Sequence, residues 1–176
     1  MHSETKIEGK RVFDGKVLKL DVDKVMLENG KTAEREVVRH IGACAVLAVD
    51  ENDDFYLVRQ FRYPYGKEML EIPAGKLDAG EEPLVCAKRE LLEETGLRAE
   101  KWEYIGGFCP SPGYTDEIVH IYIARELSLG VSNPDEDEFL DIEKYNIIKI
   151  SKMIDSGEIT DAKTVLAIYK YALSER

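Results

Sequence analysis

The start of the chain alternates apolar and polar residues with the two-residue period of a half-buried β-strand. Residues 10–27 alternate on both sides of an Asp-Gly pair, Asp14 and Gly15, which predicts an antiparallel hairpin. The turn-forming residues 28–31 (Glu-Asn-Gly-Lys) separate it from a further predicted strand at 34–40. The N-terminal region is therefore predicted to be an antiparallel β-hairpin region.

The middle of the chain contains the most apolar segment. The continuous apolar run at 42–49 predicts a strand that is buried on both faces. A turn at 51–54 separates it from a predicted strand at 55–61. Further strands are predicted at 102–108, 118–126 and 140–150, with a loop at 109–117 between the first two.

Helical periodicity predicts three helices, beginning with one that runs from Pro83 to the residue before Gly96. Proline suits the first helical turn and glycine suits the left-handed cap after the last. An apolar stripe of Leu84, Ala87 and Leu91 anchors this helix to a core and leaves its acidic edge exposed to a cleft. A short helix is predicted at 151–156 and a longer one at 161–173. The apolar face of the longer helix is predicted to consist of Val165, Tyr169, Ala172 and Leu173. Strands mixed with helices indicate an α/β or α+β domain.

Composition narrows the possible functions. A chain of 176 residues, 44% hydrophobic, is long enough for one domain with a substantial core. The net charge of −11 argues against broad nucleic-acid binding, although bound metal ions could still attract a small phosphorylated substrate. A polar N-terminus and the lack of a long apolar run predict neither a secretory signal nor a membrane span. Cys44, Cys86 and Cys109 lack metal-type spacing and are predicted to be buried free thiols, which favours a reducing cytoplasm.

Three carboxylates, Glu90, Glu93 and Glu94, lie within one turn of the helix that follows Pro83. Their mutual repulsion costs stability unless cations lie among them, and a hard divalent ion with oxygen ligands is a natural counter-charge. The alternative is a solvated acidic helix face. A calcium-buffering protein is disfavoured because the sequence contains no 12-residue EF-hand loop.

The spacing of the residues between positions 75 and 97 matches the Nudix box. The matching residues are Gly75, Glu81, Arg89, Glu90, Leu91, Glu93, Glu94, Gly96 and Leu97. The chain thus resembles the Nudix hydrolases, which cleave a nucleoside diphosphate linked to another group. The resemblance implies the Nudix fold, a mixed β-sheet held between helices, and a single domain over 1–176. Within it, about 1–40 would contribute to a dimer and 41–176 would form the catalytic core.

The resemblance also implies the metal site. Glu90 and Glu94 would be the main ligands of Mg²⁺ or Mn²⁺, with Glu93 contributing and the backbone carbonyl of Ala74 adding another oxygen. More than one ion per site is expected, since divalent ions neutralise an anionic pyrophosphate and polarise its phosphorus.

Three further acidic positions and one arginine complete the expected site. Arg89 would hold the carboxylates in place through a salt bridge, and Glu81 would be either a distal metal contact or the partner that orients Arg89. In the acidic loop 134–139, Glu136 is the expected base that activates water, with Glu138 as the runner-up or as a metal contact. The alternative for this loop is a solvated acidic turn.

The segments LEIPAGK, at 70–76, and SPG, at 111–113, resemble the ADP-ribose pyrophosphatase branch, as do the N-terminal strands. This branch implies a homodimer that splits ADP-ribose into AMP and ribose 5-phosphate. Expected substrate contacts are Arg35 and Arg62, whose guanidinium groups suit phosphate and adenine, Glu71 on the ribose or adenine edge, and Pro112 and Gly113. Each arginine could instead form a surface ion pair.

Two alternative functions remain. One is hydrolysis of another nucleoside diphosphate sugar or of a dinucleotide. The other is a non-catalytic module that senses ADP-ribose, which is disfavoured because every carboxylate of the box is present.

Overall fold

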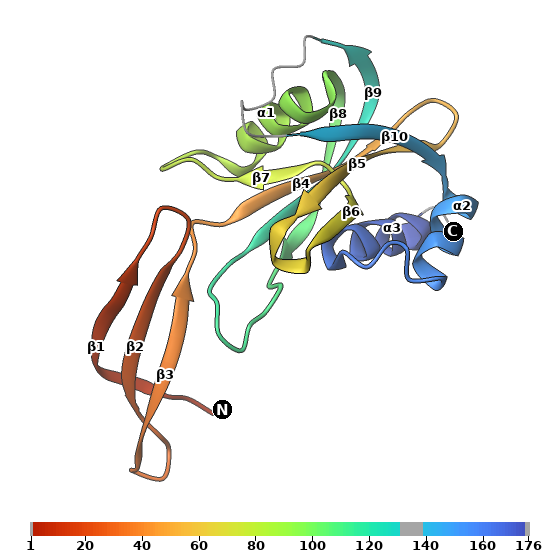
Figure 1. Cartoon of the computed structure of the whole chain (residues 1–176). Coiled ribbons are helices and arrows are strands. Elements are labelled where there is room, and N and C mark those ends of the chain that lie inside the picture. The colour runs from red at the N-terminus through yellow and green to blue at the C-terminus, as the bar shows by residue number, and fades with distance from the viewer. Residues whose placement is uncertain (1, 131–138, 175–176) are drawn as a thin grey trace. The chain divides into compact units, whose positions relative to one another are not determined.

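The computed structural model describes residues 2–130 and 139–174, which form two compact units. One unit comprises Met1–Ile41 and Cys109–Ile118, and the other comprises Gly42–Phe108 and Val119–Arg176. Figure 1 shows the elements of both units. The expected organisation as one functional domain stays a prediction.

The first unit is a three-stranded antiparallel sheet in the order β1-β2-β3. Its strands are β1 (Thr5–Asp14), β2 (Lys19–Met26) and β3 (Thr32–Arg39). The hairpin predicted around Gly15 is confirmed, since the Gly15 amide donates to the carbonyl of Leu18 at 3.0 Å. The loop 109–117 belongs to this unit because Val38 pairs with Thr115 and Arg39 forms an ion pair with Asp116 at 3.1 Å.

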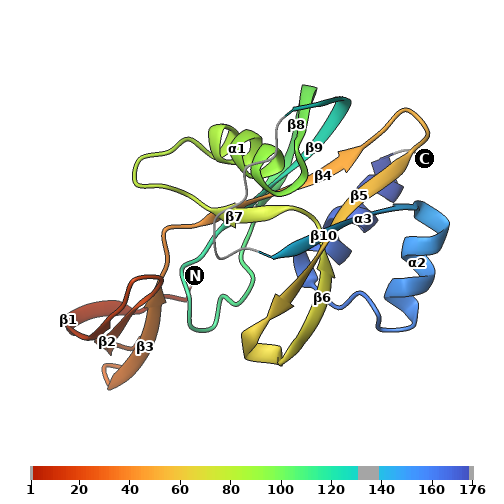
Figure 2. The ribbon, with the colours of Figure 1, turned by 45° about the horizontal axis from the view of Figure 1, so that its top comes forward.

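The second unit contains a seven-stranded mixed sheet with the order β10-β5-β4-β9-β8, which Figures 1 and 2 show from two directions. These strands are β4 (Ala43–Val49), β5 (Asp54–Arg62), β8 (Leu97–Phe108), β9 (Val119–Leu129) and β10 (Leu140–Asn146). Two short strands were not predicted: β6 (Lys67–Glu71) pairs with β5, and β7 (Ala74–Lys76) pairs with β4. A 3₁₀ turn, η1 (Tyr63–Tyr65), connects β5 to β6. The β4–β9 pair is parallel and all other pairs are antiparallel.

Strand β4 is buried on both faces, as its continuous apolar run predicts. Alternate residues pack into two separate cores. Those on one face (Cys44, Val46 and Ala48) pack with α1 (Pro83–Thr95), and those on the other (Ala45, Leu47 and Val49) pack with α2 (Ile147–Asp155) and α3 (Ala162–Ser174). The sheet therefore lies between α1 on one side and α2 and α3 on the other (Figure 2), which confirms the predicted fold class.

Helix α1 has the boundaries that the sequence predicts. It begins at Pro83 and ends at Gly96, whose φ of 67° is left-handed and whose amide donates to the Leu92 carbonyl at 2.8 Å. The prediction that its acidic edge is exposed is wrong. Glu90 is 7% exposed and Glu94 is 3% exposed, because strand β7 packs against this edge of the helix.

The C-terminal strand was predicted too long. Strand β10 ends at Asn146, whose side chain accepts a hydrogen bond from the Lys149 amide at 2.9 Å and so caps α2. The β-branched residues Ile147, Ile148 and Ile150 made the first turn of this helix resemble a strand.

Helix α3 lies close to its predicted bounds. Val165 of the predicted apolar face packs against the core, but two other residues of that face are exposed. Tyr169 and Leu173 are 48% and 64% exposed. The buried face instead consists of Thr164, Ala167, Ile168 and Tyr171, which have the same helical spacing in a different phase. Thr164 belongs to this face although threonine is polar: it is completely buried, with its hydroxyl hydrogen-bonded on both sides.

The cysteine prediction is correct for two residues and wrong for one. All three thiols are free; Cys44 and Cys86 are buried, whereas Cys109 is exposed because it lies in the loop that follows β8. Among the residues that the structure describes, no helix is long and apolar enough to cross a membrane.

Candidate active site

The box carboxylates lie where α1 packs against the strand that carries the first glycine of the box. Gly75 lies in β7, and a Cβ placed on it would come within 2.0 Å of the Glu90 carboxyl group. The neighbouring amide of Ala74 donates to Glu94 Oε2 at 3.0 Å. Strand β7 therefore packs directly against both carboxylates of α1. Gly75 leaves the space that Glu90 occupies, and the Ala74 amide binds Glu94.

Arg89 is the cation at the centre of the cluster. Its Nη1 donates to Glu90 Oε1 at 2.6 Å and to Glu93 Oε2 at 3.0 Å, and its Nη2 donates to the Lys76 carbonyl at 3.1 Å. Glu81 accepts two bonds from the same guanidinium, at 3.1 Å from Nε and 2.9 Å from Nη2. One arginine thus connects the loop before α1 to two carboxylates on the helix.

The two hydrogen bonds between Arg89 and Glu81 shift the pKa of both groups. The hydrogen bonds from Arg89 lower the pKa of Glu81 to about 2, and the hydrogen bonds to Glu81 raise the pKa of Arg89. Glu81 also accepts from the Asp78 amide at 2.9 Å, so it fastens the turn that leads into the helix. In this structure Glu81 is the partner of Arg89; a metal contact stays a prediction.

The donor chemistry of the cluster suits a hard divalent cation. Glu90 and Glu94 are buried carboxylates one helical turn apart, and anionic groups in such a place need counter-charge. Within residues 2–130 and 139–174, no three acidic, histidine or cysteine side chains have already converged on one ion position. The residues thus supply oxygen ligands of the type that a hard divalent cation prefers.

Sequence reasoning missed the contribution of Cys86 to this cluster. Its buried thiol donates to the carbonyl of Lys76 at 3.4 Å and accepts a contact from Arg89 Nη2 at 3.5 Å. Burial and the neighbouring Cys44 thiol raise the pKa of Cys86, so it stays protonated and serves as a packing group beneath the loop.

A second charged cluster lies at the end of β6. Glu71 accepts two bonds from Arg62, from Nε and from Nη2, each at 2.7 Å, and one from Lys163 at 2.5 Å. Burial opposes ionisation of Glu71, but the hydrogen bonds from Arg62 and the charge of Lys163 outweigh it and lower the pKa of Glu71. Lys163 was not predicted as a site residue. Its position in the first turn of a helix, where the helix dipole disfavours a cation, is the sequence signal that could have revealed it.

The other expected site residues lie elsewhere. Arg35 belongs to the first unit and pairs with Glu4 at 2.5 Å, and Pro112 and Gly113 lie in the loop of that unit. Glu136 and Glu138 lie outside the described residues.

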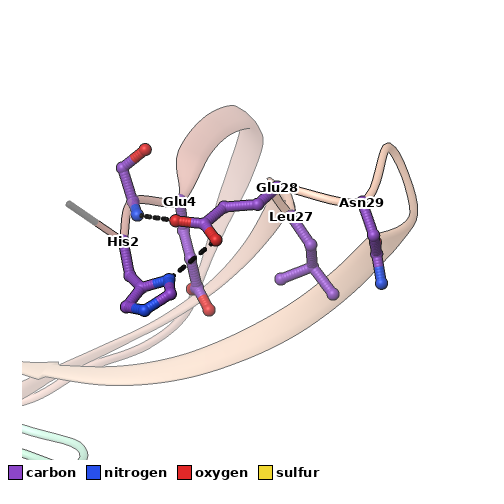
Figure 3. Close-up of a pocket in the computed structure, with 6 residues that line it drawn as sticks. His2, Glu4, Leu27, Glu28 and Asn29 are labelled. Carbon is purple, nitrogen blue, oxygen red and sulfur yellow. Dashed lines mark hydrogen bonds and ion pairs between the residues drawn. The ribbon is translucent and has the colours of Figure 1, made fainter.

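One hollow in the first unit lies at the start of the chain (Figure 3). There, Glu28 accepts from the Ser3 amide at 2.6 Å and pairs with His2 at 2.8 Å. These contacts are local and give the hollow no group positioned for hydrolysis.

The chain is similar to known proteins in both sequence and structure. The family model described as NUDIX domain matches residues 38–166. The chain is 46% identical over 174 residues to an ADP-ribose pyrophosphatase of Bacillus subtilis (strain 168), with 98% of this chain and 94% of the relative covered. It is 44% identical over 177 residues to a methanol dehydrogenase activator of Bacillus methanolicus, with 99% and 96% covered. A solved structure titled as an ADP compounds hydrolase superposes with a TM-score of 0.84 at 22% identity, covering 96% of this chain and 92% of that one, which supports the fold.

Proposed function

Since this chain belongs to the Nudix family and is a hydrolase of phosphoanhydride bonds, we propose that its substrate is ADP-ribose, split into AMP and ribose 5-phosphate. The observation that supports this choice most is the 46% identity to an ADP-ribose pyrophosphatase over nearly the whole of both chains. The LEIPAGK and SPG segments that suggested this branch lie within the matched region.

We propose that Glu90, Glu93, Glu94 and the Ala74 carbonyl bind Mg²⁺, with Mn²⁺ as a possible substitute. The burial of Glu90 and Glu94 supports this assignment, because buried carboxylates gain most from a divalent counter-ion. When bound, such ions would neutralise the pyrophosphate and activate the attacking water. Electrostatic stabilisation of this kind is the main requirement of phosphoryl-transfer chemistry.

Arg89 and Glu81 support the metal ligands in this proposal. The guanidinium fixes the positions of Glu90 and Glu93, and Glu81 orients the guanidinium through two hydrogen bonds. Because both partners of the Glu81–Arg89 pair also contact the backbone at Asp78 and Lys76, the carboxylates keep one arrangement before an ion binds.

The base and the substrate contacts stay proposals that come from the family resemblance. Glu136 is proposed to activate water, with Glu138 as the alternative, and a loop is a suitable place for a group that acts after substrate has bound. Arg62 is proposed to bind a phosphate; Arg35, Pro112 and Gly113 are proposed as further substrate contacts.

We also propose that the protein is a cytoplasmic homodimer built through its N-terminal strands. Several large apolar residues of the three-stranded sheet are exposed, and burying exposed apolar side chains between two copies would favour association. They include Ile7, Val12, Phe13 and Met26, at 48%, 47%, 55% and 39% exposure. Light scattering on the full chain and on a variant with V12K and F13K tests this; a wild-type monomer would contradict it.

The second candidate is hydrolysis of a dinucleotide or another nucleoside diphosphate sugar. It is favoured by the 34% identity over 151 residues to a GDP-mannose pyrophosphatase of Cronobacter sakazakii (strain ATCC BAA-894), a protein named for another nucleoside diphosphate sugar.

The test is a substrate panel with purified protein and Mg²⁺. ADP-ribose, other nucleotide sugars, diadenosine polyphosphates, NADH and nucleoside triphosphates are compared by kcat/KM. ADP-ribose should rank first, with AMP and ribose 5-phosphate as products. If NADH or another sugar nucleotide ranks well above it, the second candidate replaces the first.

A further inference from the structure

Glu71 is a buried carboxylate whose two oxygens are both used by cations. It is 3% exposed and lies at the end of β6, where Arg62 donates to Oε1 and Oε2 through two nitrogens and Lys163 donates to Oε2. A carboxylate at this depth is stable only while it is paired and hydrogen-bonded. Its bonding capacity is therefore directed to Arg62 and Lys163, with little left for a sugar hydroxyl.

Arg62 differs from Lys163 in how much of its side chain reaches solvent. The Arg62 side chain is 36% exposed and the Lys163 side chain is 17% exposed. Nε and Nη2 of Arg62 are bound by Glu71, but Nη1 forms no hydrogen bond with any residue in the described ranges 2–130 and 139–174. The planar guanidinium is thus fixed on one edge and keeps donors on the other, a geometry that suits a phosphate oxygen.

The charge of one box carboxylate, Glu94, acts on this guanidinium. The pKa of Arg62 is raised mainly by its hydrogen bonds to Glu71, and the charges of Glu94 and Asp161 raise it further. Glu94 is one of the proposed metal ligands. A phosphate held by a metal ion at Glu94 would therefore lie within the field of Arg62.

Lys163 is held in place by helix α3. It is the second residue of the helix, where the dipole disfavours a positive charge, and it is compensated by Glu71 and by Asp161 at 3.1 Å. The adjacent Thr164 fixes the same turn to the residue after Glu71: its hydroxyl accepts from the Ile72 amide at 2.8 Å and donates to Asp161 at 2.6 Å. The helix terminus therefore presents Lys163 to Glu71 in one orientation.

We propose that Glu71 and Lys163 are positioning residues that hold the Arg62 guanidinium toward the phosphoanhydride of the substrate. Glu71 then acts through Arg62 and not on the ribose or the adenine edge. Lys163 supplies a second positive charge to the buried carboxylate of Glu71. Because Glu71 is then neutralised by two cations, it does not pull Arg62 away from the substrate. The inference rests on the proposed function only in requiring a phosphoanhydride at the box carboxylates; it does not depend on the sugar.

The experiment measures two quantities on the full-length protein with Mg²⁺. One is the Kd of α,β-methylene-ADP, which carries a non-hydrolysable diphosphate, by calorimetry. The other is KM and kcat for the best substrate of the panel. The variants are R62A, E71Q, K163M and K163R, together with K163M in the R62A background. K144M is the matched control. Lys144 lies in β10, pairs with Asp50 at 2.8 Å and has no proposed contact with substrate.

Loss of one charge-assisted hydrogen bond to the diphosphate should weaken binding by about tenfold. R62A, E71Q and K163M should each raise Kd and KM by about this factor with little change in kcat, and K163R should restore most of the loss. K163M should have no further effect when R62A is already present, because a residue that acts through Arg62 cannot act in its absence. K144M should match wild type.

Several results would overturn the inference. They are an R62A variant that binds α,β-methylene-ADP as wild type does, K163M and R62A effects that multiply, or a wild-type protein that does not bind α,β-methylene-ADP. If E71Q is unfolded by thermal denaturation, the decision rests on the K163M and K163R pair. Tight binding of α,β-methylene-ADP with a low rank for ADP-ribose on the panel would remove only the proposed substrate and leave this inference intact.

Discussion

The missing side chain of Gly75 makes room for the carboxylate of Glu90. A Cβ on Gly75 would lie 2.0 Å from Cδ and Oε1 of Glu90, far closer than non-bonded atoms approach. The glycine therefore serves close approach and not a turn, which explains why the first position of the box is a glycine inside a regular strand.

Substitution of Gly75 by alanine should reduce activity and spare the fold. The atoms in the way belong to the far end of the Glu90 side chain and not to the backbone, so Glu90 can turn aside without a change of fold, but it then leaves its place beside Arg89. Activity should fall by roughly 10- to 100-fold, the usual cost of disturbing the surroundings of a metal site. The measurement is kcat/KM against Mg²⁺ concentration. G75A should add nothing in an E90Q background; a further large loss there would mean that Gly75 acts on something other than Glu90.

Substitution of Glu94 by glutamine should reduce turnover by more than the roughly 10- to 100-fold expected for an outer partner of a metal. Glutamine keeps an oxygen that can accept from the Ala74 amide, so the fold should survive while the charge is lost. Turnover is compared with thermal unfolding and with calorimetric Mg²⁺ binding. E94Q activity equal to that of wild type would exclude Glu94 from the metal site.

The Glu81–Arg89 pair should make stability depend on acid pH. The folded pKa of Glu81 is about 2, below its ordinary value of 4.5, so the pair contributes fully above about pH 4.5. That contribution is lost as the pH falls from about 4.5 toward 2, because the unfolded chain then binds the proton first. The difference in the free energy of unfolding between wild type and E81Q, from urea titrations, should be constant near neutrality and shrink over this window. A difference that does not change with pH would contradict the assignment.

The catalytic base can be identified by two matched variants in the acidic loop. Loss of a general base costs about 10²- to 10⁴-fold in rate, so E136Q should lower kcat by that order with little change in KM. E138Q should have a smaller effect. If E136Q behaves as wild type and E138Q is inactive, the two roles are exchanged.

Local sequence determined the elements whose residue pattern does not depend on contacts with distant parts of the chain. The period-two pattern and turn residues gave the N-terminal hairpin, Pro83 and Gly96 gave both ends of α1, and the apolar run gave the doubly buried β4. The spacing of Glu90, Glu93 and Glu94 placed three carboxylates on one helical turn, and the resemblance of residues 75–97 to the Nudix box implied the chemistry.

Tertiary structure decided what depends on contacts between distant segments. Thr164 is buried on the face of α3 that packs in the core, and its hydroxyl accepts from the amide of Ile72, 92 residues away. Glu90 and Glu94 are buried because β7 packs against α1, and Glu71 meets Lys163 only because β6 and α3 come together. The sequence thus determined which groups could bind a metal and break a phosphoanhydride. Only the fold decided which of them are desolvated and which cation each one holds, because burial and pairing depend on packing between elements far apart in the chain.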